Sequence, residues 1–231
     1  KYFTERQLEN LYLGLGRGAY NYAFKNGKPY CFQDMIPDKK TLLNIHRICF
    51  DIHVELKERY GFDTDIVFSR PNYCKIDLMV ANGRGDNLFL QESELDMLKK
   101  DMAEHGINGG LKQLMGLAGA VGKKYQIAVV PTCDAKYLEV GISSKSDNVD
   151  AIFGRMQEEG GIKPNECAYW GDEYVGIEDG IFGSDSFMHT KITEAGDFFD
   201  VSDIKSTSRP DWVKVVGGGV ESFLGFLRGT G

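Results

Sequence analysis

The chain has 231 residues, a net charge of −7 and an ordinary composition, with 42% hydrophobic and 26% charged residues. Its length allows one large domain or two small ones, and its composition is that of a globular protein. The negative charge argues against general nucleic-acid binding, which needs a basic face, although a small anionic ligand can still bind beside a metal ion or a lysine.

The cysteines and the apolar segments indicate the compartment. Five cysteines are scattered along the chain and form no CxxC pair: Cys31, Cys49, Cys74, Cys133 and Cys167. This spacing favours neither a disulfide framework nor a zinc site. No apolar run approaches transmembrane length, and no signal-peptide pattern is present. We therefore expect a reducing, cytoplasmic location and no membrane partner, while the oligomeric state stays open.

Up to about residue 142 the pattern predicts an α+β layer. The expected helices span residues 4–24, 38–60, 93–105 and 109–122, and the expected strands span 66–69, 73–81, 125–130 and 137–142. Thr4 and Gln7 fit a capping box that begins the first helix. Apolar residues repeat near the helical period before Gly61, which ends the second helix. The alternation of helices with pairs of strands predicts an antiparallel sheet with helices on one face.

From about residue 143 the pattern changes. Val149, Ile152, Phe153 and Met156 have the spacing of one helical face, so an amphipathic helix is expected from Lys145 onwards. Further strands are expected over residues 167–170, 187–190, 198–201 and 213–216, with a last helix over 220–227. This order is typical of one half of a doubly wound α/β sheet.

An acidic loop follows the strand expected at 167–170. The strand ends abruptly at Gly171-Asp172, and Glu173, Glu178 and Asp179 follow within one loop. Ligands of open α/β sheets bind beyond the carboxyl ends of strands, and Mg²⁺ prefers oxygen ligands that include one or two carboxylates. A solvated acidic surface loop explains the composition about as well. The abrupt end of the strand favours a metal site.

Three basic residues are candidates for binding an anion. Lys145 begins a helix, at the end where the helix dipole favours anions over cations. Arg70 and Lys75 lie close to a junction between a strand and a turn and can reach an anionic ligand. For Arg70 and Lys75, charges exposed on a strand are the more ordinary interpretation.

Lys145 at the start of a helix, followed 27 residues later by Asp172 at a Gly-Asp strand end, resembles the C-terminal half of haloacid dehalogenase (HAD) superfamily phosphatases. The resemblance implies that Lys145 neutralises substrate phosphate and that Asp172 helps to bind Mg²⁺. It also implies an α/β fold with two parts, an α+β cap domain of type 2 over residues 1–142 and the C-terminal part of a Rossmann-like core over 143–231.

The sequence departs from this family at two places. The family's second acidic residue stands four positions after the first, where this chain has Gly176, so Glu173 or Asp179 is expected to replace it as a metal ligand. The family's nucleophile lies in a DxDxT motif, which these 231 residues lack. The layout predicts that this motif lies upstream of Lys1.

The resemblance implies a Mg²⁺-dependent phosphatase that acts on a small phosphorylated metabolite, plausibly a sugar phosphate, through an aspartyl-phosphate intermediate. Lys145 and the metal ion would stabilise the charge of the transferred group, which is the main requirement of phosphoryl transfer. Two alternatives stay open: a phosphomutase similar to phosphomannomutase, and a catalytically silent binding module that lacks the nucleophile. The sequence does not name the substrate.

Overall fold

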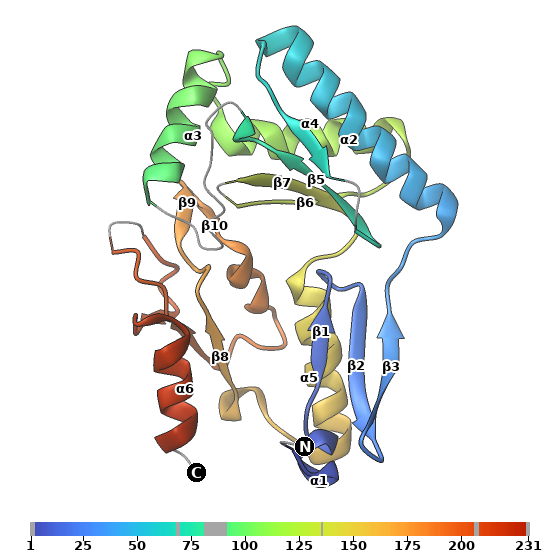
Figure 1. Cartoon of the computed structure of the whole chain (residues 1–231), viewed down its shortest axis with the longest axis vertical. Helices are drawn as coiled ribbons and strands as arrows, with labels where there is room; N and C mark the ends of the chain where they lie inside the picture. Colours follow the sequence, from blue (N-terminus) through green and yellow to red (C-terminus); the bar gives the residue numbers. More distant parts are fainter. Residues whose placement is uncertain (1–2, 68–69, 81–91, 135, 206–207, 230–231) are drawn as a thin grey trace.

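The computed structural model describes residues 3–67, 70–80, 92–134, 136–205 and 208–229. Within these ranges the chain has a mixed α/β fold whose strands form four sheets (Figure 1). The α/β class expected from the sequence is confirmed.

The first large part, here called the four-stranded unit, spans residues 39–141. Its strands follow the order β4-β5-β7-β6 with antiparallel pairing throughout. The strands are β4 (Asp65–Val67), β5 (Tyr73–Asp77), β6 (Val130–Cys133) and β7 (Tyr137–Gly141), and the helices are α2 (Lys39–Tyr60), α3 (Glu92–Glu104) and α4 (Gly110–Lys124). All three helices agree with the sequence prediction, whereas the strand expected at 125–130 begins at Val130.

The two faces of this sheet differ in chemistry because side chains alternate along each strand. Cys74, Ile76, Leu138 and Val140 are fully buried in the apolar core beneath the helices. Their neighbours point the other way, and the register pairs Glu139 of β7 with Lys75 of β5 and Thr132 of β6. The sheet therefore has one apolar face and one polar, charged face.

The N-terminal segment does not form the helix expected over residues 4–24, so that prediction is wrong. The capping box of Thr4 starts only α1 (Glu5–Glu9), and a three-stranded antiparallel sheet follows: β1 (Leu13–Leu15), β2 (Tyr20–Lys25) and β3 (Lys28–Asp34). Positive φ angles of 64° and 90° at Gly16 and Gly18 are incompatible with a helix. Asn26 and Gly27, with φ of 53° and 71°, make the tight turn between β2 and β3.

The second large part, here called the parallel unit, spans residues 145–229. Its sheet has the order β12-β11-β8, and both pairings are parallel. The elements are α5 (Lys145–Gly160), η2 (Pro164–Glu166), β8 (Ala168–Gly171), β9 (Gly176–Glu178), β10 (Ile181–Phe182), η3 (Ser184–Met188), β11 (Asp197–Asp200), β12 (Val213–Val215) and α6 (Gly219–Gly229). The strand expected at 187–190 is wrong, because the chain turns there in the 3₁₀ helix η3.

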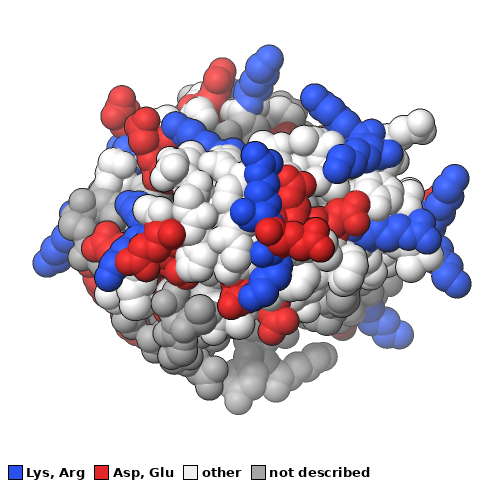
Figure 2. Space-filling view, turned by 90° about the horizontal axis from the view of Figure 1, so that it is seen from above, with Lys and Arg blue, Asp and Glu red and all other residues white. Residues whose placement is uncertain are grey.

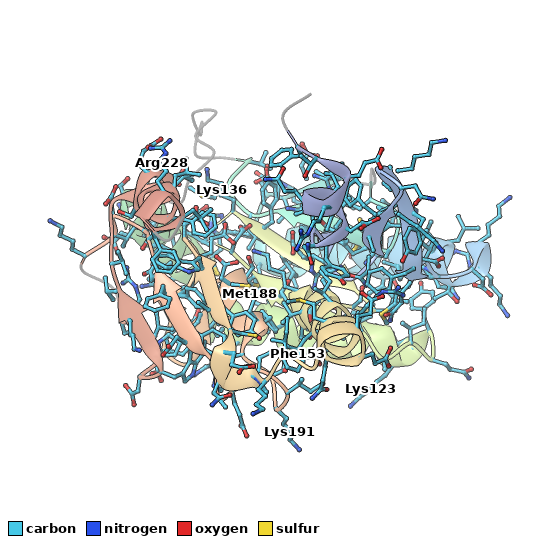
Figure 3. The ribbon with its side chains drawn as sticks, turned by 90° about the horizontal axis from the view of Figure 1, so that it is seen from below. Lys123, Lys136, Phe153, Met188, Lys191 and Arg228 are labelled. Carbon is cyan, nitrogen blue, oxygen red and sulfur yellow. The ribbon has the colours of Figure 1, made fainter. Side chains whose placement is uncertain are left out.

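Aromatic packing holds this unit together. Trp170 of β8 stacks on Phe199 of β11 with 4.5 Å between ring centroids, and α6 covers the same face with Phe226. In the view from below, Phe153 of α5 and Met188 of η3 lie on the inner side, whereas Lys191 projects outward (Figure 3). Only 3% of Phe153 is exposed, as expected from its place on the apolar face of the helix.

The N-terminal sheet lies against α5, and the buried side chain of Asn148 makes three of the hydrogen bonds between them. Its Oδ1 accepts a hydrogen bond from Gly18 N at 2.6 Å, and its Nδ2 donates to Tyr20 O at 3.1 Å and Asn21 Oδ1 at 2.8 Å. The division of the chain at residue 142 stays a prediction. These contacts place the N-terminal sheet beside the helix that follows that boundary (Figure 1).

The outer surface carries both signs of charge. In the view from above, lysine and arginine side chains are interspersed with aspartate and glutamate among the residues drawn (Figure 2). None of the described helices combines the length and the hydropathy that a transmembrane span requires.

We expect Asn148→Ala to destabilise the protein by about 1–3 kcal/mol, because it leaves the buried Gly18 N–H without an acceptor. Urea unfolding should show a lower midpoint with an unchanged slope. Asn165→Ala, at an exposed position in η2, is the matched control and should leave the midpoint unchanged. Equal midpoints for both variants would show that Asn148 does not hold the N-terminal sheet to α5.

Candidate active site

Lys145 lies in the first turn of α5, which begins with a complete capping box. Ser144 is the N-cap and accepts a hydrogen bond from Ser146 N, while the Asp147 carboxylate accepts one from Ser144 N at 2.7 Å. The lysine side chain extends from this turn to the loop after β8. Its Nζ lies 2.7 Å from Asp185 Oδ1 and 3.8 Å from Glu173 Oε2.

Asp185 is the centre of this arrangement. While Oδ1 contacts Lys145, Oδ2 accepts hydrogen bonds from the backbone N–H groups of Asp172 and Glu173, both at 2.9 Å. The Asp185 side chain is only 9% exposed. A side chain at Gly171 would clash with this carboxylate, so the glycine before Asp172 lets the carboxylate approach the end of β8.

Asp172 and Glu173 complete an acidic group around Lys145. Burial raises the pKa of Asp172 above its ordinary value, and the nearby carboxylates of Asp185 and Glu173 raise it further. Ser184 Oγ donates a hydrogen bond to Glu173 Oε2. Burial acts to lower the pKa of Lys145, but the carboxylates of Asp185 and Glu173 outweigh it and raise that pKa.

Sequence reasoning missed Asp185 because a hairpin separates it from Asp172. The two residues are thirteen positions apart, and β9 and β10 fold out between them. At the base of the hairpin, Gly183 N donates to Val175 O at 2.9 Å and Asp185 N to Glu173 O at 3.3 Å. The sequence does contain a signal for this hairpin. Gly180 stands between two short apolar segments, which is a hairpin pattern, and Asp185 follows the second segment.

The structure does not bring Asp179 into this group. Asp179 lies at the turn of the β9–β10 hairpin, where its side chain is fully exposed and 3.6 Å from Lys112 Nζ. Asp172 and Glu173 are brought together with Lys145, and Asp185 takes the place in the group that was expected for Asp179.

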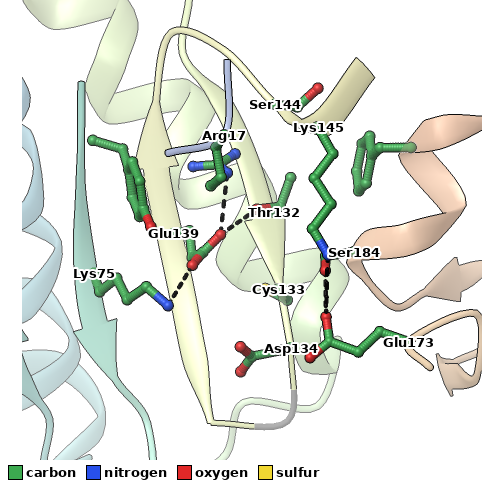
Figure 4. Close-up of a pocket in the computed structure, with 12 residues that line it drawn as sticks. Arg17, Lys75, Thr132, Cys133, Asp134, Glu139, Ser144, Lys145, Glu173 and Ser184 are labelled. Carbon is green, nitrogen blue, oxygen red and sulfur yellow. Dashed lines mark hydrogen bonds and ion pairs between the residues drawn. The ribbon is translucent and has the colours of Figure 1, made fainter. Parts of the chain in front are cut away.

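Lys75 lies on the polar face of the four-stranded unit, in a cluster around Glu139. Its Nζ lies 2.6 Å from Glu139 Oε1, and Arg17 Nε lies 3.1 Å from Glu139 Oε2 (Figure 4). Thr132 Oγ1 also donates to Glu139 at 3.1 Å. Arg70, in contrast, lies exposed in the connection between β4 and β5 and is not among the residues that line the pocket described next.

A pocket of about 230 Å³ lies between the two units. One wall carries Lys145, Glu173 and Ser184, and the other carries the Glu139 cluster together with Asp134 (Figure 4). Burial raises the pKa of Asp134 to about 6 against the effect of two backbone hydrogen bonds. The pocket thus has charged side chains on both walls, with one lysine on each.

The acidic group has the donor chemistry that suits Mg²⁺. Asp172, Glu173 and Asp185 offer carboxylate oxygens, and the pKa of Asp172 is raised first by burial and then by the negative charge of its two neighbours, which a cation would relieve. In the described part of the chain, no three acidic, histidine or cysteine side chains are placed to hold a metal ion by themselves. Mg²⁺ commonly takes one or two carboxylates and completes its shell with waters and substrate phosphate.

Comparison with known proteins finds a loose structural similarity. No protein-family model matches the chain, and no curated protein matches it. A solved structure of ATP-bound Plasmodium falciparum IMP-nucleotidase is 12% identical, with a TM-score of 0.47, and the match covers 81% of this chain and 39% of that one. The IMP-bound, N-terminally truncated form is 13% identical, with a TM-score of 0.43 and coverages of 73% and 40%.

The chain therefore spans about two fifths of the length of these solved proteins.

The raised pKa of Asp134 predicts a pH-dependent stability. A carboxyl group with a folded pKa above its unfolded value of about 3.9 stabilises the protein at low pH, and this contribution is lost as the pH rises through about 6. Asp134→Asn should therefore be more stable than wild type above pH 6 and similar below about pH 4. Urea unfolding at pH 4 and pH 7 tests this. A variant with the same stability relative to wild type at both pH values would contradict it.

Proposed function

We propose that the protein is a phosphatase that acts on a small phosphorylated metabolite. One observation carries the proposal: Lys145 projects from the first turn of α5 to the carboxyl end of β8, where Asp172, Glu173 and Asp185 gather beside a polar pocket. The end of a parallel strand is where open α/β sheets bind their ligands, and a lysine beside carboxylates suits a phosphate with its cation.

The chain's own residues would act on the phosphate by charge. Lys145, held by Asp185, would face the phosphate oxygens and favour their developing charge without having to reorganise. Asp172 and Glu173 would hold Mg²⁺ together with waters and substrate phosphate, and the ion supplies further charge neutralisation when it is bound. The Asp185 carboxylate fixes the backbone of Asp172 and Glu173, so these groups are positioned before substrate arrives.

The nucleophile that this chemistry needs is expected upstream of Lys1. Among the described strands, β8 pairs only with β11, so its other edge is open. A further parallel strand along this edge would bring its carboxyl end next to Asp172, and an aspartate there would accept the phosphoryl group.

The four-stranded unit would act as the cap that selects the leaving group. Its polar face presents Lys75, Glu139 and Thr132 toward the pocket, in hydrogen-bonding positions that suit hydroxyl groups. We therefore favour a polyhydroxylated leaving group, as in a sugar phosphate. A catalytically silent binding module would keep the pocket and bind phosphate without turning it over.

Asp185→Asn and Asp172→Ala should each lower Mg²⁺-dependent phosphate release by on the order of 10²-fold or more in the protein that carries the upstream segment. The assay measures release of inorganic phosphate from a panel of sugar phosphates. Asp179→Asn, at the exposed turn of the hairpin, is the matched control and should keep wild-type turnover. If phosphate release by Asp179→Asn fell as far as that by Asp185→Asn, the assignment of Asp185 to the site would be wrong.

Lys145→Ala should weaken the binding of inorganic phosphate with Mg²⁺ by roughly tenfold or more, because it removes the lysine charge on the wall of the pocket that also carries the acidic group. Lys163→Ala, at an exposed position beyond the end of α5, removes the same charge far from the pocket and should leave affinity unchanged. Isothermal titration of both variants checks this. Equal affinities would place the phosphate elsewhere, and phosphate binding without any turnover would favour the silent module.

A further inference from the structure

The β9–β10 hairpin interrupts the acidic loop and reaches into the other unit. It leaves the loop after Glu173 and returns just before Asp185, so both of its ends belong to the candidate active site. In Figure 1 it rises from β8 toward α3 and the four-stranded sheet.

The apolar side of the hairpin belongs to the core of the four-stranded unit. Ile177 of β9 is 1% exposed and is part of the core cluster that includes Leu111 and Leu114 of α4. Ile181 of β10 packs against the same cluster. The parallel unit thus contributes a buried side chain to the core of its neighbour.

The polar side of the hairpin contacts the first turn of α4. Glu178 Oε2 accepts a hydrogen bond from Leu111 N at 2.6 Å, and the N-cap residue Gly109 makes no side-chain capping bond. A carboxylate at a helix N-terminus is favoured by the free N–H groups and by the helix dipole. A side chain at Gly110 would clash with the Glu178 carboxylate, so the glycine is needed for this approach.

We propose that Glu178 is a positioning residue that couples the four-stranded unit to the acidic loop. Glu178 caps α4, and Ile177 is buried in the core of the four-stranded unit, so the far end of the hairpin is fixed on that unit. The base of the hairpin carries Glu173 and Asp185 and is thereby held in place. The coupling would keep the acidic loop ordered only while the four-stranded unit lies over the pocket. Its role in metal binding rests on the phosphatase proposal.

The coupling is reciprocal, as linkage between two sites requires. A change at the start of α4 must loosen the backbone around Asp172 and Glu173, and a ligand that orders this backbone must protect the start of α4. Two amides report on the acidic loop, because Asp172 N and Glu173 N both donate to Asp185.

Amide hydrogen exchange on the ligand-free protein tests the coupling. Glu178→Ala should speed exchange of the Asp172 and Glu173 amides by on the order of tenfold, while the amides of β5 and β7 keep their wild-type rates. Glu178→Gln keeps a side-chain acceptor and should restore most of the protection. Asp179→Ala, next along the hairpin, removes only the solvent-exposed ion pair with Lys112 of α4; it is the control and should change neither set of amides.

A second variant acts from the other unit. Gly110→Ala should strain the start of α4, where φ is 56°, and displace Glu178, so it should speed exchange of the same two amides although residue 110 is not part of the acidic loop. Wild-type exchange at Asp172 and Glu173 in both Glu178→Ala and Gly110→Ala would overturn the proposal. Equally fast exchange in β5 and β7 would also overturn it, because the effect would then be a general loss of stability.

The mutant comparison contains no metal or phosphate, so its result does not depend on the phosphatase proposal. A separate measurement on wild type adds Mg²⁺ and inorganic phosphate. Protection should then rise both at Asp172 and Glu173 and at Leu111 of α4. Protection at the acidic loop alone would contradict the coupling, whereas a wild type that binds no phosphate would count against the phosphatase and leave the mutant result standing.

Discussion

The structure depends on one buried carboxylate, that of Asp185. It receives the Lys145 ammonium on one oxygen and the amides of Asp172 and Glu173 on the other. Charge-assisted hydrogen bonds of this kind are about twice as strong as neutral ones, and removing Lys145 would leave the buried Asp185 carboxylate without its ion-pair partner. Asp185 therefore fixes the start of α5 relative to the end of β8, and with it one wall of the pocket.

Much of the fold could be predicted from the sequence because its signals are local. The apolar period before Gly61 predicted α2, and the spacing of Val149 to Met156 predicted α5. The prediction of a helix over residues 4–24 was wrong because a capping box at Thr4 specifies only where a helix begins, and not how far it continues. The left-handed backbone at Gly16 and Gly18 ends any helix there and favours the sheet instead.

The candidate site was predicted in part for the same reason. Lys145, Asp172 and Glu173 stand at element ends that the sequence marks, whereas Asp185 depends on a hairpin that only tertiary contacts define. The environment of Lys75 was not predictable either, because its partner Glu139 lies on a strand that is distant in sequence. Pairing of β5 with β7 turned an apparent surface charge into a pocket residue with a side chain 17% exposed.

We propose that Asp172, Glu173, Asp185 and Lys145 form one binding site for a cation and a phosphate. The most direct measurement is a titration with Mn²⁺, a paramagnetic substitute for Mg²⁺, in the presence of inorganic phosphate, followed by the NMR signals of backbone amides. We expect selective broadening at residues 171–173 and 184–186 and at the first turn of α5, with little change at Asp179. Broadening centred on the hairpin turn at Asp179, or spread over many exposed carboxylates, would contradict it.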